Sequence, residues 1–432
     1  KVKEDHIFDV EITSNRPDAA SIYGLAREAN AILNFNGLKS GLVAPKGVST
    51  SLMPDVREKL SIEVTIENQS LCPRFTAIIL DNVKIKPSPA LVRNRLEACN
   101  IRSINNIVDI TNYLMLELGQ PMHAFDFDKI KGAKMYLRES KIGESIKTLD
   151  DQNRKLPQGA IVISDAERLI DLCGIMGGAN SEISTRTKRV LLFVQAYDPI
   201  RIRRTTQSLA FRTEAAARFE KGVDIESISQ ALSVAVYLAK QNSGAKIASE
   251  LIDIYKNPPK TKSIELQKSL LDQYLGIELP LEKASRILKL LGFTVKTETE
   301  SLTAQPPSWR HQDMETAEDL IEEIARVYGY YNLPSTLRTG NQPSQNTPSD
   351  LSQVISLKNA LKYLSLTEVM SYSIISEEFL KLTGVKKENA VELSNPLSNE
   401  WQFMRPSILV SLASIISQNQ NMRNDLKIFE IA

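Results

Sequence analysis

Apolar residues that recur every three or four positions predict amphipathic helices in this chain. The first helix follows Asp18. Its apolar face consists of Ile22, Leu25, Ala26, Ala29, Ile32 and Leu33. Because a carboxylate accepts hydrogen bonds from the free N–H groups of a first turn, we expect Asp18 to cap this helix. Further helices are predicted around 230–238 and over 281–291, and Gly292 is placed to end the latter in a left-handed conformation.

Short apolar or alternating runs predict strands elsewhere in the chain. These runs span residues 7–12, 61–67, 74–79, 190–194, 293–296 and 426–431. The run at 190–194 is apolar throughout, which is typical of a strand buried on both faces. The last run has no segment after it with which to pair, and the chain starts at Lys1 rather than Met. We therefore interpret the sequence as an internal piece of a longer protein.

Polar stretches that contain Gly and Pro divide the chain into four predicted domains. The domains span residues 1–45, 56–255, 263–337 and 350–432. The second mixes helices and strands. The third has two helices, a small sheet and a closing helix, a pattern that favours a winged-helix-like module. The fourth starts another α/β domain that the chain does not finish. The predicted fold class is therefore multidomain α+β.

The composition excludes several classes of protein. The 432 residues include 53 Lys plus Arg and 52 Asp plus Glu. This balance excludes a strongly basic nucleic-acid binder, but it leaves room for a large RNA-binding surface with local basic patches. With three scattered cysteines and only three histidines, a zinc site is not expected. Cysteines that do not form a paired motif fit a reducing cytoplasm. No apolar run is long enough to cross a membrane, so no membrane partner is expected.

Four carboxylates near residue 320 form the first candidate site. Asp319, Glu322 and Glu323 have the spacing of one helical face, and Asp313 lies one short turn upstream. Converging oxygen ligands of this kind suit Mg²⁺. The same spacing also fits a solvated acidic helix, in which Asp319 belongs to an N-terminal capping box and Arg326 pairs with the glutamates. The spacing alone leaves both interpretations open.

The second candidate site lies in the middle domain, but its residues alone do not define a reaction. His123 could be a structural histidine, Asn112 a strand-end cap, and Gly174 a turn residue with positive φ. No Ser-His-Asp or Cys-His arrangement is evident. The segment 174–178 reads Gly-Ile-Met-Gly-Gly, which lacks the acidic residue and the βαβ unit of a dinucleotide site.

Motifs along nearly the whole chain nevertheless resemble one family. The segment 309–334 contains Trp-Arg, an aspartate, Glu-Asp-Leu-Ile-Glu-Glu-Ile-Ala-Arg-Val-Tyr-Gly-Tyr and Leu-Pro. Further blocks lie at 14–18, 104–113, 120–126, 174–178, 212–224 and 393–400. Together and in this order they resemble the β subunit of bacterial phenylalanine–tRNA ligase. In that family an oligonucleotide-binding barrel is inserted before the block at 14–18, and it is missing here.

The resemblance implies a role for the four carboxylates. In the family the matching acids bind Mg²⁺ at the contact with the α subunit, and they carry over to Asp313, Asp319, Glu322 and Glu323. Within this segment the sequence departs from the family in its spacing, because two residues rather than one separate Arg310 from Asp313.

The resemblance also implies an editing-type, tRNA-binding domain at 56–255. The family's site positions carry over to Asn112, His123, Gly174, Thr213 and Ala215, which hold misattached tyrosine and position a water for ester hydrolysis. A pocket for phenylalanine rejects tyrosine only about 10²-fold, so hydrolysis of the wrong product is needed. Phe193 stands where the family has a glutamate that receives the tyrosine hydroxyl. Losing that acceptor costs about 1–3 kcal/mol, so we expect tyrosine editing to be weakened.

The family further implies the partners and the chemistry. The holoenzyme, an α₂β₂ assembly in the cytoplasm, joins phenylalanine to its tRNA with ATP. The α subunit activates the amino acid, and residues 350–432 resemble the start of an inactive class II synthetase-like domain. Two alternatives remain at this point: a stand-alone hydrolase of misacylated tRNA, and a non-enzymatic RNA- or protein-binding module.

Overall fold

A computed structural model describes residues 6–336, 349–421 and 425–432. The chain divides into two compact units, residues 1–335 and 336–432, and each is described by itself. The first two predicted domains, and all but the last two residues of the third, thus lie within one unit. Among the described residues, no helix is both long and apolar enough to cross a membrane.

Two five-stranded sheets form the larger lobe of the first unit. One has the order β1-β4-β7-β8-β9 and the other the order β11-β2-β10-β3, with β12 also paired to β2. The strands of the first sheet are β1 (Glu63–Ile66), β4 (Lys134–Glu139), β7 (Ile161–Ser164), β8 (Leu169–Leu172) and β9 (Met176–Gly177). Those of the second are β2 (Arg74–Asp81), β3 (Met122–Asp126), β10 (Val190–Ala196), β11 (Lys246–Ile247) and β12 (Ile252–Ile254). A small hairpin, β5 (Ser145–Lys147) and β6 (Asn153–Lys155), completes the strands of this lobe.

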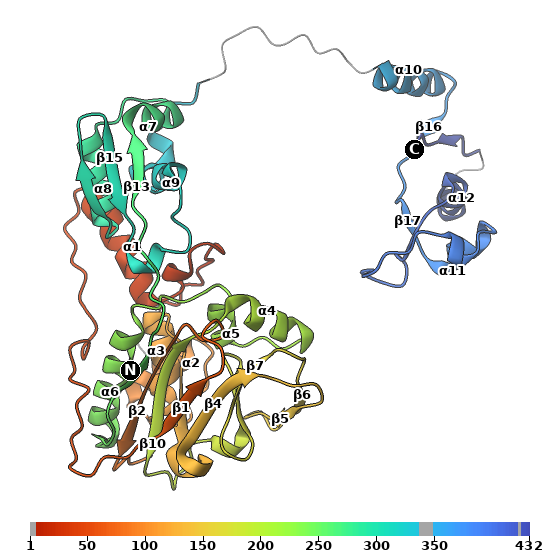
Figure 1. Ribbon diagram of the computed structural model, residues 1–432. Helices are drawn as coiled ribbons and strands as arrows, with labels where there is room; N and C mark the ends of the chain where they lie inside the picture. Colours follow the sequence, from red (N-terminus) through yellow and green to blue (C-terminus); the bar gives the residue numbers. More distant parts are fainter. Residues whose placement is uncertain (1–5, 337–348, 422–424) are drawn as a thin grey trace. The chain divides into compact units, whose positions relative to one another are not determined.

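Helices cover one face of the second sheet. The helices of this lobe are α2 (Ala90–Ala98), α3 (Val108–Leu118), α4 (Pro199–Ser208), α5 (Glu214–Phe219) and α6 (Ile228–Ser243). Helices α3 and α6 contact β3 and β10, respectively, and contact each other (Figure 1). All seven residues of β10 are buried, which confirms the prediction of a strand covered on both faces.

A smaller lobe contains a three-stranded antiparallel sheet and three helices. Its strands are β13 (Ile264–Gln267), β15 (Ser301–Gln305) and β14 (Thr294–Thr297), in that order across the sheet. Its helices are α7 (Lys268–Leu275), α8 (Leu281–Leu290) and α9 (Ala317–Tyr328). Gly292, with φ of +93°, follows α8 as predicted. Side chains of α8 and α9, among them Ile287, Leu320 and Ile324, fill the core of this lobe.

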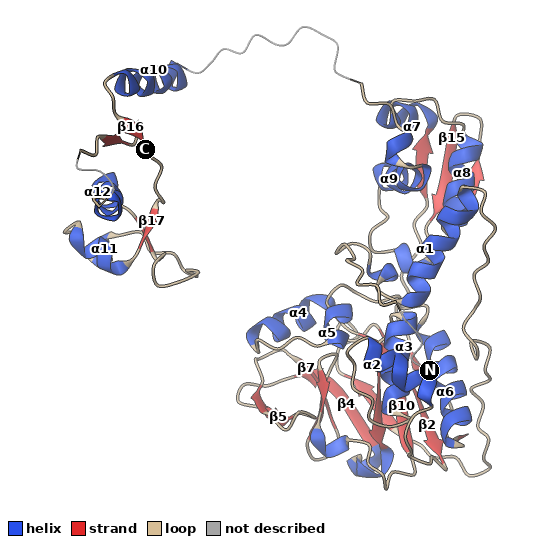
Figure 2. Ribbon diagram, turned by 180° about the vertical axis from the view of Figure 1, so that it is seen from behind, coloured by secondary structure: helices blue, strands red, loops and turns tan. Residues whose placement is uncertain are grey.

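Helix α1 (Ile22–Phe35) joins the two lobes. It contacts α3 of the larger lobe and both α8 and α9 of the smaller one (Figure 2). Ala31, which is fully buried, belongs to the core of the smaller lobe although it lies more than 200 residues earlier in the chain. The position of α1 therefore depends on residues that are distant in sequence.

The second unit has a small core. It contains α10 (Ser349–Tyr363), α11 (Glu377–Leu382) and α12 (Ile408–Asn419), and two strand pairs: β16 (Thr367–Glu368) with β19 (Ile428–Phe429), and β17 (Ile374–Ile375) with β18 (Phe403–Met404). Ile375, Leu380 and Phe403 are buried. No residue of α12 is fully buried although the helix is largely apolar, and its Leu409 and Ile416 side chains are exposed.

The structure corrects three expectations from the sequence. Residues 7–12 form no strand, and Phe8 is 84% exposed, because no neighbouring strand supplies hydrogen bonds there. Ser21 rather than Asp18 caps α1: its hydroxyl accepts from the N–H of Gly24 at 3.0 Å, while Asp18 pairs with Arg16. The strand predicted at 426–431 is only Ile428–Phe429, and it pairs with β16, which precedes it in the chain.

Candidate functional site

A buried arginine organises the acidic segment. Arg310, in the short 3₁₀ helix Ser308–Arg310, is 2% exposed. Its Nη1 donates to Glu323 Oε2 at 2.7 Å, and its Nη2 donates to Asp313 Oδ2 at 2.9 Å. A buried guanidinium needs such partners, since an unpaired charge in the interior is costly. Two of the four predicted metal ligands are therefore ion-pair partners of one cation.

Arg326 extends this pairing from α9 to α1. It donates to both carboxylate oxygens of Glu323, and its Nη1 donates to Glu28 Oε2 at 2.5 Å. Arg16 donates to the other oxygen of Glu28 at 2.6 Å. We call this alternating set the ion-pair network: Arg16, Glu28, Arg326, Glu323, Arg310 and Asp313. The ion-pair network ties the N-terminal helix to the closing helix of the smaller lobe.

The network sets the charge states of its two central acids. Burial opposes ionisation of Glu323, but hydrogen bonds from Arg326 and Arg310 outweigh it and lower the pKa of Glu323 to about 2. Burial raises the pKa of Asp313 despite its hydrogen bonds with Arg310. Glu323 is thus firmly ionised at neutral pH and neutralised by protein cations.

The other two predicted ligands, Asp319 and Glu322, do not pair with these arginines. Asp319 Oδ2 accepts from the N–H groups of Glu315 and Thr316, both at 2.8 Å, and completes a capping box with Thr316. Glu322 is exposed on α9. No group of three or more His, Cys, Asp or Glu residues within the described part of the chain could hold a metal ion. In the described residues the acidic segment thus has the geometry of the capped acidic helix, and Mg²⁺ binding by these four side chains stays a prediction.

One of the editing-type site positions, His123, lies beside Phe193 of β10 and Gly177 of β9. His123 on β3 lies directly opposite Phe193 on β10, with their ring centroids 5.7 Å apart. A Cβ atom on Gly177 of β9 would overlap His123 Nε2, so a glycine is required there. Burial lowers the pKa of His123 to about 4, which keeps its imidazole neutral at pH 7. A neutral imidazole can both donate and accept a hydrogen bond.

Thr213 and Gly174 hold adjoining parts of this region together. Thr213 caps α5, and its hydroxyl donates to the carbonyl of Ile175 at 2.9 Å. Ala215, in the first turn of α5, packs at the edge of the core. Gly174 has φ of +70°, and a Cβ atom there would come within about 3.0 Å of Tyr197 and Phe219. The structure thus brings Thr213, Ala215 and Gly174 close together.

The structure rules out one of the two roles that the sequence offered for Asn112. It lies half-buried within α3 rather than at the end of a strand, so it is no strand-end cap.

Phe193 is part of a closed aromatic cluster. Its side chain is fully buried, and its ring lies 4.9 Å from Phe125 and 5.6 Å from Phe75 between centroids. With His123, these rings fill the space around the position where the resemblance places a hydroxyl acceptor. Phe193 itself has no polar atom to offer a phenolic hydroxyl.

The sequence interpretation missed several buried polar groups of the larger lobe. Gln195, two residues further along β10 and therefore on the same face, is 3% exposed, and its Oε1 has no hydrogen-bond partner. The buried hydroxyl of Tyr197 also has none. Burial raises the pKa of Asp171 on β8 to about 8. Gln195 could have been noticed as the one amide inside an otherwise apolar run, whereas Asp171 gives no comparable signal in the sequence.

Three domain families match this chain in succession. Residues 71–244 match the B3/4 domain, and residues 264–330 match the tRNA synthetase B5 domain. Residues 333–432 match the phenylalanyl-tRNA synthetase beta chain CLM domain. The larger lobe, the smaller lobe and the second unit thus each correspond to one of these families.

Curated relatives match along nearly the whole chain. A phenylalanine–tRNA ligase beta subunit of Carboxydothermus hydrogenoformans is 36% identical over 433 residues, which is 99% of this chain and 53% of the relative. One of Dehalococcoides mccartyi is 36% identical over 439 residues, 98% of this chain and 53% of the relative. The chain therefore spans about half the length of these relatives.

One solved structure has a related description. It is an N-terminal fragment of the phenylalanyl-tRNA synthetase beta subunit from Pyrococcus horikoshii. The match has a TM-score of 0.37 and 18% identity, and it covers 73% of this chain and 85% of that chain.

Proposed function

The chain is a homologue of phenylalanine–tRNA ligase β subunits over nearly its whole length, and on this basis we propose that it serves as such a subunit in the cytoplasm. It supports the ATP-dependent attachment of phenylalanine to its tRNA, a reaction catalysed by an α subunit. The observation that carries the proposal is the match of about 36% identity across 99% of the chain. The B3/4, B5 and CLM families follow in the same order as the structural parts.

An α subunit is the partner that this proposal requires, in an α₂β₂ assembly. The uncovered apolar side chains of α12, such as Leu409 at 71% exposure, support further protein packing on the second unit. Co-expression with a cognate α subunit should give a stoichiometric complex that aminoacylates phenylalanine tRNA. A chain that purifies without α but hydrolyses misacylated tRNA would favour a stand-alone hydrolase. A chain that binds RNA without either activity would favour a binding module.

Amino-acid activation is assigned to the α subunit rather than to this chain. Residues 333–432 match the CLM domain, which we take as the start of an inactive class II synthetase-like fold. The chain alone should therefore show no ATP–pyrophosphate exchange with phenylalanine. Exchange in a preparation free of α subunit would refute this assignment.

We further propose that the larger lobe binds the acceptor end of charged tRNA and hydrolyses tyrosyl-tRNA only weakly. Neutral His123 is suited to orient a water beside an ester. Thr213, Ala215 and Gly174 shape the neighbouring backbone. Phe193 supplies no acceptor for the tyrosine hydroxyl, so the discrimination between tyrosine and phenylalanine should be small.

Mg²⁺ binding by the acidic segment stays a prediction for the assembled enzyme. Asp319 and Glu322 are the two predicted ligands that no arginine pairs with in the described residues, so they are the informative positions. If they hold Mg²⁺ at the α contact, Glu322→Ala should weaken assembly and reduce its dependence on Mg²⁺ without changing the stability of the isolated chain. Unchanged assembly would leave only the structural roles described above.

A further inference from the structure

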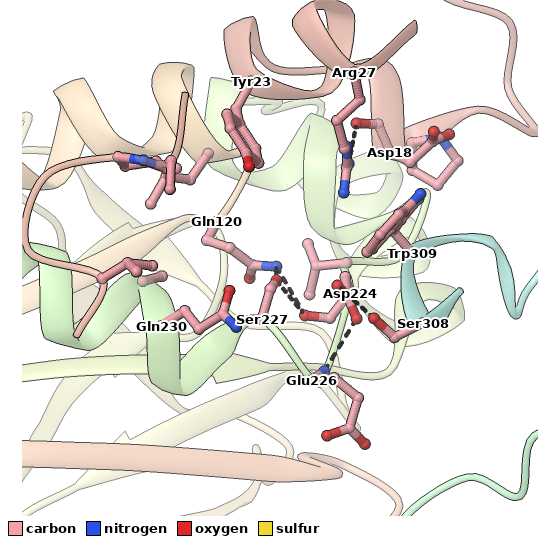
Figure 3. A pocket seen from close by; sticks show the side chains of 18 of the residues that line it. Asp18, Tyr23, Arg27, Gln120, Asp224, Glu226, Ser227, Gln230, Ser308 and Trp309 are labelled. Carbon is pink, nitrogen blue, oxygen red and sulfur yellow. Dashed lines mark hydrogen bonds between the residues drawn. The ribbon is translucent and has the colours of Figure 1, made fainter. Parts of the chain in front are cut away.

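A cavity of about 410 Å³ lies where α1, the loop after α3, the start of α6 and the Ser308–Arg310 segment meet (Figure 3). All of these parts belong to the first unit. The volume falls within the range of about 300–1,000 Å³ that is typical of small-molecule sites. Tyr23 and Arg27 come from α1, Gln120 from the loop, and Trp309 from the 3₁₀ segment (Figure 3). The cavity is distinct from the region around His123.

Arg27 brings an incompletely paired cation to the cavity wall. Its guanidinium stacks over the Trp309 ring at 4.1 Å and donates one hydrogen bond, to the carbonyl of Asp18 at 3.3 Å. Its buried Nε has no hydrogen-bond partner. No carboxylate of the described residues lies within ion-pair distance of it, and burial lowers the pKa of Arg27.

Asp224 brings an acid to the same cavity. Its carboxylate accepts from the Ser308 hydroxyl at 3.0 Å and from the N–H of Glu226 at 3.1 Å. These two bonds use about half of the acceptor positions of a carboxylate. Burial raises the pKa of Asp224, and Arg27 attracts it without forming an ion pair. Both charges thus face the cavity with their solvation only partly replaced.

Gln120 adds a free acceptor beside Asp224. The side chain is 2% exposed. Its Nε2 donates to the carbonyl of Asp224 at 2.8 Å and to the Ser227 hydroxyl at 2.6 Å, which fixes the orientation of the amide (Figure 3). Its Oε1 is buried without a partner. A buried polar atom that is left unpaired costs about 1–3 kcal/mol, unless a ligand or water satisfies it.

The remaining wall is largely apolar. Leu42, Val48 and Ala231 line it. A ligand that complements the whole cavity therefore needs an anionic group for Arg27, a cationic donor for Asp224 and Gln120, and an apolar body.

We propose that this cavity is a binding site for a small zwitterion with an apolar body, of the kind that a free apolar α-amino acid represents. The ligand carboxylate binds the Arg27 guanidinium, and the ammonium group donates to the Asp224 carboxylate and to Gln120 Oε1. The apolar body lies against Leu42, Val48 and Ala231. The inference rests on the cavity and its side chains, so it stands whether or not the proposed function holds.

Isothermal titration of the chain with L-leucine and L-phenylalanine tests the proposal. N-acetyl-L-leucine, which lacks the ammonium group, and L-leucinamide, which lacks the carboxylate, serve as matched probes. At least one free amino acid should bind with a dissociation constant below about 1 mM, and removing either charge should weaken binding roughly tenfold or more.

Two variants locate the binding. Arg27→Met removes the cation, and Gln230→Trp fills the cavity from an exposed helical position without touching the charged groups. Both should abolish binding, whereas Arg204→Met, at an exposed arginine of α4, should leave it unchanged. The proposal is overturned if neither amino acid binds up to roughly 10 mM. It is equally overturned if binding persists in folded Gln230→Trp or tolerates the loss of either ligand charge.

Discussion

Replacing Glu323 by Gln should strongly destabilise the first unit, because this carboxylate sits at the centre of the ion-pair network. It is 2% exposed and accepts hydrogen bonds from both Arg310 and Arg326. Glutamine keeps the shape of the side chain but removes the charge. After the substitution, Arg310 keeps Asp313 as its one carboxylate partner in the network, and Arg326 keeps Glu28.

The magnitude follows from the pKa of Glu323. Burial raises the pKa of Glu323, but the hydrogen bonds with Arg326 and Arg310 lower it by more. The net result is a shift of the pKa from 4.5 to about 2. At 1.36 kcal/mol per unit, the charged form gains about 3 kcal/mol of stability. Removing one partner of a buried pair costs a similar 3–5 kcal/mol or so. Because the folded-state pKa is lowered, this contribution is complete above about pH 4.5 and is lost as the pH falls through about 2.

Urea unfolding monitored by Trp309 fluorescence measures the effect. A Trp401→Phe background leaves Trp309 as the sole tryptophan, since the chain has two. Glu323→Gln should lower the unfolding free energy of the first unit by about 3 kcal/mol at pH 7. Glu322→Gln, at the exposed neighbouring position, should change it by less than about 0.5 kcal/mol. Equal effects of the two substitutions, or a Glu323 contribution that does not fade as the pH falls from 4.5 towards 2, would refute the reasoning.

Three further predictions concern the larger lobe and the acidic helix. Phe193→Glu should raise the rate of tyrosyl-tRNA deacylation, measured at equal folded concentration, although the buried carboxylate lowers stability. If the wild type hydrolyses tyrosyl-tRNA rapidly and the substitution does not change the rate, another residue must bind the tyrosine hydroxyl. Asp171 keeps its proton in the fold up to about pH 8, so wild-type stability should fall relative to Asp171→Asn as the pH rises from about 4 to 8, and parallel stability curves would contradict this. Asp319→Ala removes the capping box of α9 and should cost about 1 kcal/mol in thermal unfolding, and a cost near zero would argue against the cap.

Local patterns predicted the elements of this fold well where burial is one-sided or complete. The periodicity at 22–33 and 281–291 gave α1 and α8, and the apolar run at 190–194 gave β10. The alternation at 7–12 misled, because a strand needs a neighbour and the sequence of one segment does not reveal whether a neighbour exists.

The candidate sites were less predictable from the chain. The spacing of Asp319 and Glu323 is correct for one helical face, but Arg310, from a separate 3₁₀ segment, decides what Glu323 does. Likewise, the charge state of His123 follows from burial between strands that lie about 70 residues apart in sequence. Such pairings arise from tertiary packing, which periodicity does not encode.

The docking of α1 has a consequence for the synthesis of the protein. Glu28 and Arg326 are separated by 298 positions in the chain, so α1 emerges from the ribosome long before α9 exists. At about 5–20 residues per second, this interval lasts roughly 15–60 s. During it, Ala31 and the charged face of α1 have no smaller lobe to pack against, while the two sheets of the larger lobe can already fold. Folding of the first unit is therefore expected to finish when α9, which is synthesised last, packs against α1.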